Sequence, residues 1–168
     1  MPQEEKPIFT VSLSGETAVL RINGRASYLT SAPVNSLFSH LMDQGKQKIL
    51  VDFENCAGMD STFLGILAGG ALRIKKEFPD GFMGLCNLGP RNMELVRNLG
   101  LHRILTVVDS PDGGPSIPET AATFEALESE TVETDSVLKA HKNLIEADRE
   151  NAAKFQDVIK FLEKETNG

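Results

Sequence analysis

The stretch ILVDFENCAGMDSTFLGILAGGALRIKK, residues 49–76, contains the two kinds of element that decide the fold. An almost continuous apolar run at 48–53 is typical of a central strand that is covered on both faces. After the loop ENCAGM, an apolar helical pattern extends from about 61 to 77. A strand that leads through a short loop into a helix is the repeating unit of an α/β protein with a parallel sheet.

The same alternation continues on both sides of this stretch. The expected elements are strands at about 8–14 and 17–23, a helix capped by Ser31 and ended by Gly45, a strand at 81–88, a helix at 90–100 and a strand at 103–108. Their order predicts an α/β fold whose sheet is largely parallel, with an N-terminal antiparallel pair and flanking helices.

The C-terminal part of the chain differs from the rest in charge. Residues 1–118 carry 12 acidic and 11 basic side chains, whereas residues 119–168 carry 12 and 6, so the net charge of −7 belongs almost entirely to the tail. Together with the loop SPDGGPSIP, this asymmetry predicts a folded domain at 1–109, a linker at 110–135 with a short helix at about 116–127, and one C-terminal amphipathic helix at 136–168.

The predicted C-terminal helix has a seam of residues at heptad spacing. Its members are Leu138, His141, Ile145, Asp148, Phe155, Ile159 and Leu162. Two interpretations stay open. The helix packs on its own domain, or it offers a coiled-coil-like surface to another chain, which includes a homodimer.

Composition and motifs exclude several classes of function. An acidic chain with a pI near 5.0, no Trp and one Tyr does not fit nucleic acid. No apolar run is long enough to span a membrane, and the N-terminus does not read as a signal peptide, so we expect a cytoplasmic protein. Cys56 and Cys86 are expected to be packing residues. With no catalytic motif and no metal-ligand cluster, we expect neither an enzyme nor a bound cofactor or metal.

The polar triplet Asp60-Ser61-Thr62 stands where the strand gives way to the helix. Asp60 or Ser61 is expected to cap the helix, but capping needs only one of them. The apolar pair Phe63 and Leu64 follows at once and is expected to begin the helix exposed. A phosphate on Ser61 would be tolerated by the helix N-terminus, because that end offers unpaired N–H groups and a positive dipole, yet it would reverse the local surface charge.

Two glycines lie four residues apart in this helix, at Gly65 and Gly69. Each weakens an isolated helix by up to about 1 kcal/mol relative to alanine, so a packing reason is required. Close contact with the sheet is the expected reason.

The stretch at 49–76, followed by GFMGLCNLGPRNMELVRNLGLHRIL at 81–105, resembles the STAS domains of bacterial anti-sigma factor antagonists. Those domains have a strand, a short loop and Asp-Ser-[Ser/Thr]-Gly-Leu at the start of a helix, and a later helix that ends near Leu-Gly-Leu. The resemblance covers roughly residues 8–108.

The resemblance implies a partner-switching regulator. Its partners would be an anti-sigma factor that is also a serine kinase and a serine phosphatase that resets it. The phosphorylated hydroxyl would be Ser61, with Thr62 as second choice. Residues Asp60, Ser61, Thr62, Phe63 and Leu64 would line the docking surface, and the loop NGRASY, with Asn23, Arg25 and Tyr28, would lie beside it.

The sequence departs from the family pattern in two places. Phe63 stands where the family has Gly, which narrows the kinases that fit or removes phosphorylation altogether. The acidic extension at about 110–168 lies outside the family pattern. Two alternatives therefore stay open, a constitutive STAS scaffold that acts through the C-terminal helix, and a small-molecule or nucleotide binder at the helix N-terminus, although the latter lacks a glycine-rich phosphate loop.

Overall fold

The computed structural model describes residues 8–107, 125–127 and 134–167. Its main sheet has six strands in the order β7-β6-β4-β2-β1-β8. The strands are β1 (Phe9–Ser14), β2 (Thr17–Ile22), β4 (Lys48–Asp52), β6 (Phe82–Cys86), β7 (Thr106–Val107) and β8 (Glu125–Ala126). Strand β1 is antiparallel to both of its neighbours, and β2, β4, β6 and β7 are parallel to one another. The predicted fold class is confirmed.

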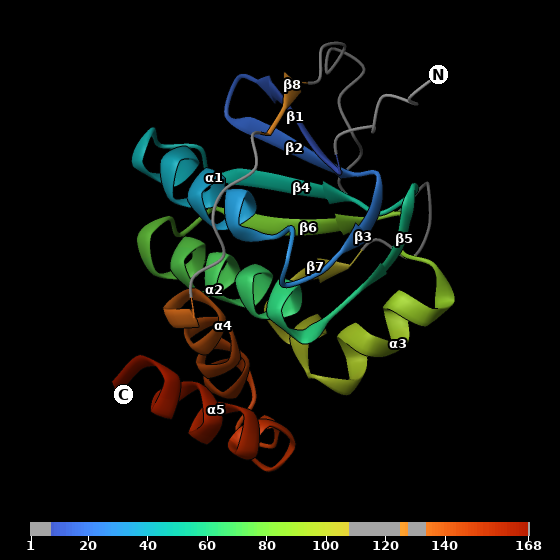
Figure 1. Ribbon diagram of the computed structural model, residues 1–168. Coiled ribbons are helices and arrows are strands. Elements are labelled where there is room, and N and C mark those ends of the chain that lie inside the picture. Colours follow the sequence, from blue (N-terminus) through green and yellow to red (C-terminus); the bar gives the residue numbers. More distant parts are fainter. Residues whose placement is uncertain (1–7, 108–124, 128–133, 168) are drawn as a thin grey trace.

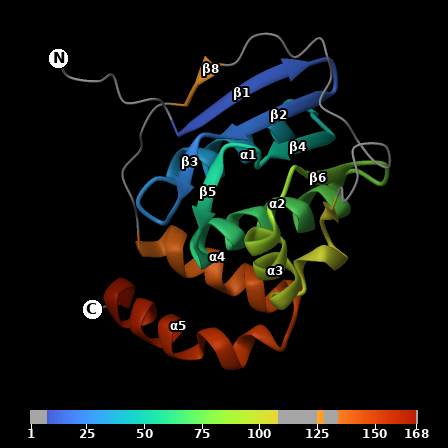
Figure 2. The ribbon, with the colours of Figure 1, turned by 90° about the vertical axis from the view of Figure 1, so that its right-hand side faces the viewer.

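Three helices connect the parallel strands. They are α1 (Ala32–Asp43), α2 (Ser61–Glu77) and α3 (Pro90–Asn98). Because successive parallel strands are added in one direction and such crossovers are right-handed, all three helices lie on the same face of the sheet, as Figure 2 shows. The main hydrophobic core fills the space between this helical layer and the sheet. A smaller cluster of Val19, Leu50 and Cys86 lies on the opposite face.

A second, two-stranded parallel sheet positions the start of α2. It consists of β3 (Gly24–Ala26) and β5 (Cys56–Met59), which follow the carboxyl ends of β2 and β4. Both segments were expected to be loops. Their pairing is tertiary, because it joins two short pieces of chain that come together only once β2 and β4 are side by side. It brings residues 23–28 next to the strand that leads into α2 (Figure 1).

The C-terminal extension contains two helices, α4 (Thr134–Ala147) and α5 (Asn151–Asn167), where one continuous helix was predicted. The chain turns at Asp148, whose carboxylate accepts the N–H of Glu150 at 3.0 Å. The buried side chain of Asn151 then donates to the carbonyl of Leu144 in the last turn of α4. These two side chains satisfy backbone groups at the break, and Asp and Asn favour helix ends for this reason. Helix α4 packs on α2, and α5 packs on α4 as the outermost layer (Figures 1 and 2).

Three smaller expectations need correction. The segment predicted as a strand at 103–108 begins instead as a short 3-10 helix, Leu101–Arg103, before β7. Most of the helix predicted at 116–127 lies outside the described residues, but its end, 125–126, is the strand β8. The Ser31 side chain does not cap α1, because its hydroxyl donates to the carbonyl of Ser27.

Candidate functional site

Asp60 fixes the geometry at the start of α2. One of its carboxylate oxygens accepts the N–H of Phe63 at 3.1 Å, which is a side-chain helix cap, and the other accepts the N–H of Tyr28 at 2.7 Å. The N–H of Asp60 itself donates to the carbonyl of Ala26 at 3.1 Å. Asp60 thus both caps α2 and ties its first turn to the segment 23–28, which lies beside it as expected.

Ser61 is the first residue of α2, and its hydroxyl contacts a residue 80 positions further along the chain. The Oγ of Ser61 lies 2.9 Å from Nε2 of His141 in α4. Nδ1 of that ring lies 2.8 Å from the carbonyl oxygen of Val137. A carbonyl oxygen only accepts, so Nδ1 carries the proton, and in the neutral ring Nε2 is then an acceptor. With a neutral ring, the Ser61 hydroxyl is therefore the donor and Nε2 of His141 the acceptor.

His141 is a buried residue rather than a surface one. Only 3% of it is exposed, and its ring meets the ring of Phe155 in α5 edge to face, with 5.3 Å between ring centres. The heptad pattern places His141 on the helical seam but does not connect it with Ser61. The available signal is a polar residue within a mostly apolar seam, which shows that a partner is needed but not which one.

The sequence predicted that the glycines of α2 make room for the sheet. In the structure they make room for α4 instead. A Cβ atom added to Gly65 would lie 2.1 Å from the carbonyl oxygen of Ala140, and one added to Gly69 would lie 2.4 Å from the amide nitrogen of Asn143. The same Asn143 amide donates to the carbonyl of Gly65 at 3.2 Å. A side chain at position 65 would push against the α4 backbone and hold the helices apart, and one at position 69 would displace the Asn143 amide, so this face of α2 is fitted to α4.

Helix α5 is anchored to α3 and to the turn that follows it. The buried Asn151 amide donates to the carbonyl of Leu99 at 3.0 Å, and Lys154 donates to the carbonyl of Asn98 at 2.6 Å. At the turn between α4 and α5, Asp148 lies 3.8 Å from the guanidinium of Arg103. The extension therefore contacts both α2 and α3.

The two apolar residues that follow the polar triplet are buried. Phe63 is 0% exposed and Leu64 is 1% exposed, contrary to the expectation that they begin the helix exposed. The Phe63 ring stacks on the ring of Phe9 in β1, with 5.9 Å between ring centres. Thr62 is also buried, at 6% exposed. Phe63 thus fills the core in place of the glycine of the family pattern.

The predicted residues in the segment beside the site are more accessible. Arg25 and Tyr28 are exposed, and Asn23 is half-buried, with its side-chain oxygen accepting from the amide of Asn55 at 3.3 Å. Next to Tyr28, which is 49% exposed, Leu29 is 63% exposed. An aromatic and an aliphatic side chain thus face solvent in the segment whose Tyr28 N–H donates to the Asp60 carboxylate.

The predicted seam of the C-terminal helix is divided between two helices that face different neighbours. His141 contacts Ser61, and Asp148 lies in the turn. The apolar members are half-buried, namely Leu138, Ile145, Phe155, Ile159 and Leu162. Val158 and Phe161 of α5 are exposed, at 39% and 62%.

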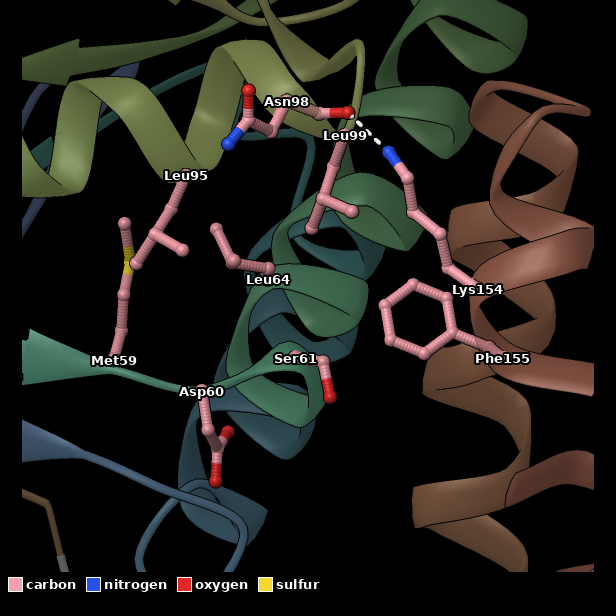
Figure 3. Close-up of a pocket in the computed structure, with 9 residues that line it drawn as sticks. All are labelled: Met59, Asp60, Ser61, Leu64, Leu95, Asn98, Leu99, Lys154 and Phe155. Atoms are coloured by element: carbon pink, nitrogen blue, oxygen red, sulfur yellow. Dashed lines mark hydrogen bonds between the residues drawn. The ribbon is translucent and has the colours of Figure 1, made fainter. Parts of the chain in front are cut away.

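A pocket of about 530 Å³ lies between the STAS-like body and α5, beside Ser61. Figure 3 shows Met59, Leu64 and Leu95 side by side, with the Phe155 ring on the α5 side and the Lys154 amine held at the Asn98 carbonyl. The lining is mostly apolar, and the space lies where the extension meets the domain.

The remaining chemistry of the described residues is modest. Burial raises the pKa of the Cys56 and Cys86 thiols, which keeps both protonated and unreactive at neutral pH. Among residues 8–107, 125–127 and 134–167, no group of three or more His, Cys, Asp or Glu is placed to hold a metal ion. No helix in these same ranges is both long and apolar enough to cross a membrane.

Comparison with solved structures identifies the same fold in bacterial regulators. The anti-sigma factor antagonist SpoIIAA in its unphosphorylated form is 24% identical, with 62% of this chain and 90% of that chain covered and a TM-score of 0.51. The Bacillus cell fate determinant SpoIIAA in the phosphorylated form is 22% identical, with 61% and 92% covered and a TM-score of 0.50. An anti-sigma factor antagonist from Mycobacterium paratuberculosis is 17% identical, with 62% and 86% covered and a TM-score of 0.52. No curated protein matches the chain.

The STAS domain family matches residues 9–113, which is more than half of the 168-residue chain. Helices α4 and α5 lie beyond that match. The chain therefore belongs to the STAS domain family and carries two C-terminal helices in addition to the domain.

Proposed function

We propose that this protein is a cytoplasmic, non-catalytic anti-sigma factor antagonist whose binding to an anti-sigma factor with serine kinase activity is controlled by phosphorylation of Ser61. The observation that carries the proposal is the position of Ser61, at the first turn of α2 directly after the capping Asp60, within a STAS domain. Solved structures of the same fold are described as anti-sigma factor antagonists, and one of them as a phosphorylated form.

The local physics supports a phosphate at this residue. Asp60 occupies the N–H of Phe63, but the first turn of a helix has further unpaired N–H groups and the positive end of the helix dipole. A phosphate adds about −1.5 to −2 charges at pH 7. The helix would tolerate this charge, whereas an apolar or acidic surface of a partner would not.

The docking surface that we propose is narrower than the sequence suggested. Phe63 and Leu64 support the helix from the core and do not face solvent. The candidates that remain are the half-buried Asp60 and Ser61 and the exposed Arg25 and Tyr28, to which the structure adds the exposed Leu29. Tyr28 is well suited to a contact of this kind, because aromatic side chains contribute large contact areas at protein interfaces.

The test is to isolate the protein from its own cells with phosphatases inhibited and to map phosphate by mass spectrometry. We expect a modified fraction on Ser61, and none on this peptide in the variant Ser61→Ala. In a pull-down, Ser61→Ala should retain the anti-sigma factor in the presence of ATP, and Ser61→Asp should lose it. An unmodified chain under all growth and stress conditions, with equal binding by both variants, would refute the proposal.

A second candidate function rests on the exposed side chains of α5. Val158 and Phe161 present an apolar surface that the described residues do not cover, which suits a constitutive scaffold or a homodimer. Replacing both by Lys should then abolish complex formation, while Ser61 variants should have no effect. The opposite pattern would favour the phosphorylation switch.

A further inference from the structure

The contact between α4 and the start of α2 has a consequence for access to Ser61. The hydroxyl that a kinase would have to reach is hydrogen-bonded to His141, a residue that is 3% exposed. Close to it, the backbone of Ala140 lies against Gly65, one turn further along α2. A protein that engages Ser61 and the first turn of α2 would need the space that α4 occupies.

The fit between α4 and α2 is specific rather than incidental. Gly65 leaves room for the Ala140 backbone, Gly69 leaves room for the Asn143 side chain, and Asn143 donates to the Gly65 carbonyl. Ala140 and Leu144, at 1% and 0% exposed, join the hydrophobic core of the domain. Helix α4 is therefore packed as part of the domain.

The pocket beside Ser61 does not offer an alternative route for a protein. It opens between α5 and the domain and measures about 530 Å³, which is the size of a small-molecule site. A small reagent can enter such a space, but the active site of a kinase cannot, because a kinase must surround the segment that it modifies.

We propose that α4 is an intramolecular cover for Ser61, so that the α4–α5 pair must leave the STAS domain before a kinase or a docking protein can engage the start of α2. The cover acts by occupying the surface, with His141 holding the hydroxyl and Ala140 filling the place opposite Gly65. A competing partner would have to present a similarly small contact at Gly65, as a helix with a small residue does. The inference takes its biological meaning from the proposed function, but the physical claim concerns access alone.

The test uses a cysteine at position 61 and a reagent too large for the pocket. In the full-length protein with Cys56→Ser and Cys86→Ala, the substitution Ser61→Cys provides one thiol, and a polyethylene glycol maleimide of several kilodaltons provides the probe. Labelling is followed as a shift in mass on a gel. Two further substitutions break the contact from opposite sides, Gly65→Ala from α2 and Ala140→Glu from α4.

Each perturbing variant has a matched control. Gly89→Ala is a second glycine-to-alanine change, at a position where an added Cβ meets nothing within 4 Å. Lys139→Glu places a glutamate on the exposed side of α4, next to the buried Ala140. The parent is the single-cysteine protein without a further substitution, and both controls should label at its rate.

We expect labelling at least about tenfold faster in Gly65→Ala and in Ala140→Glu than in the parent, because the rate follows the fraction of molecules in which α4 has left. A parent that labels as fast as these two variants would overturn the proposal, and so would slow labelling in both variants. The assay needs neither a kinase nor a sigma factor. A failure to find phosphate in cells would therefore count against the proposed function and leave the labelling result standing. Slow labelling of both perturbing variants would refute the cover and leave the proposed function standing.

Discussion

The substitution Asn151→Asp should release the C-terminal helices from the domain although it changes only one non-hydrogen atom. Asn151 is 0% exposed, and its amide nitrogen donates to the carbonyls of Leu99 and Leu144 at 3.0 and 2.8 Å. Its side-chain oxygen has no hydrogen-bond partner among the described residues. The amide nitrogen is thus the only group that holds this side chain in place.

An aspartate puts an oxygen where the donor was. Two hydrogen bonds worth about 1 kcal/mol each are lost, and two carbonyl oxygens then face an acceptor at hydrogen-bond distance. Burying the carboxylate, or protonating it, costs at least about 1 kcal/mol more. Docking of α4 and α5 should therefore weaken by about 3 kcal/mol or more, which corresponds to a change of more than about a hundredfold in the docking equilibrium.

Hydrogen exchange measured by mass spectrometry reads this equilibrium directly. Peptides from Thr134–Ala147 and Asn151–Asn167 should lose protection by a large factor, while β4 and β6 keep theirs. The control is Asn35→Asp, which makes the same change at an exposed residue. Unchanged protection of α5 in Asn151→Asp would refute the view that this amide anchors the extension.

Four further substitutions have expected outcomes. Asp60→Ala should lower the free energy of unfolding by about 1–2 kcal/mol in urea titrations, since the cap on Phe63 and the Tyr28 bond are lost, and a stability equal to wild type would contradict the role of the cap. Phe63→Ala should cost about 3–5 kcal/mol in the same assay, whereas Tyr28→Ala should cost less than about 0.5 kcal/mol and act only on partner binding. Burial raises the pKa of the Cys86 thiol above its ordinary value of 9.0, so folding favours the protonated thiol. The stability that this group contributes is therefore present below pH 9.0 and is lost as the pH rises through the pKa of the folded state. The variant Cys86→Ala should accordingly show a smaller loss of stability between neutral and alkaline pH than wild type.

The sequence predicted best what local chemistry decides. The α/β order follows from apolar periodicity. A cap at Asp60 or Ser61 follows from the preference of these residue types for helix starts, and the structure shows that Asp60 is the cap. The pairing of β3 with β5 was missed, since strands of three and four residues carry little pattern of their own and form only beside a neighbour. The break at Asp148 was missed for a related reason. A heptad pattern continues through the break, and the hydrogen bonds of Asp148 and of the buried Asn151 explain why the helix does not.

The contact at the centre of the site shows why the rest could not be predicted. The glycines of α2 indicated a close approach, and the polar residue in the C-terminal seam indicated an unsatisfied partner. Each observation has many solutions when taken alone. The contact between Ser61 and His141 connects the two observations. It is a tertiary contact, and no periodic pattern in a single sequence predicts it. Substitutions at Gly65 therefore test a tertiary contact that the helical pattern itself conceals.

The cover and the switch are linked by thermodynamics. If docked α4 excludes a partner from the start of α2, a bound partner must exclude α4 by the same free energy. A domain that is covered in 99 of every 100 molecules would show an apparent affinity about a hundredfold weaker than its intrinsic one. Asn151 is linked to Ser61 only through α4. Its amide donates to Leu144 of α4, and His141 of the same helix contacts Ser61. Asn151→Asp should therefore raise modification of Ser61, an effect at a distance that a merely local hydrogen bond between serine and histidine would not produce.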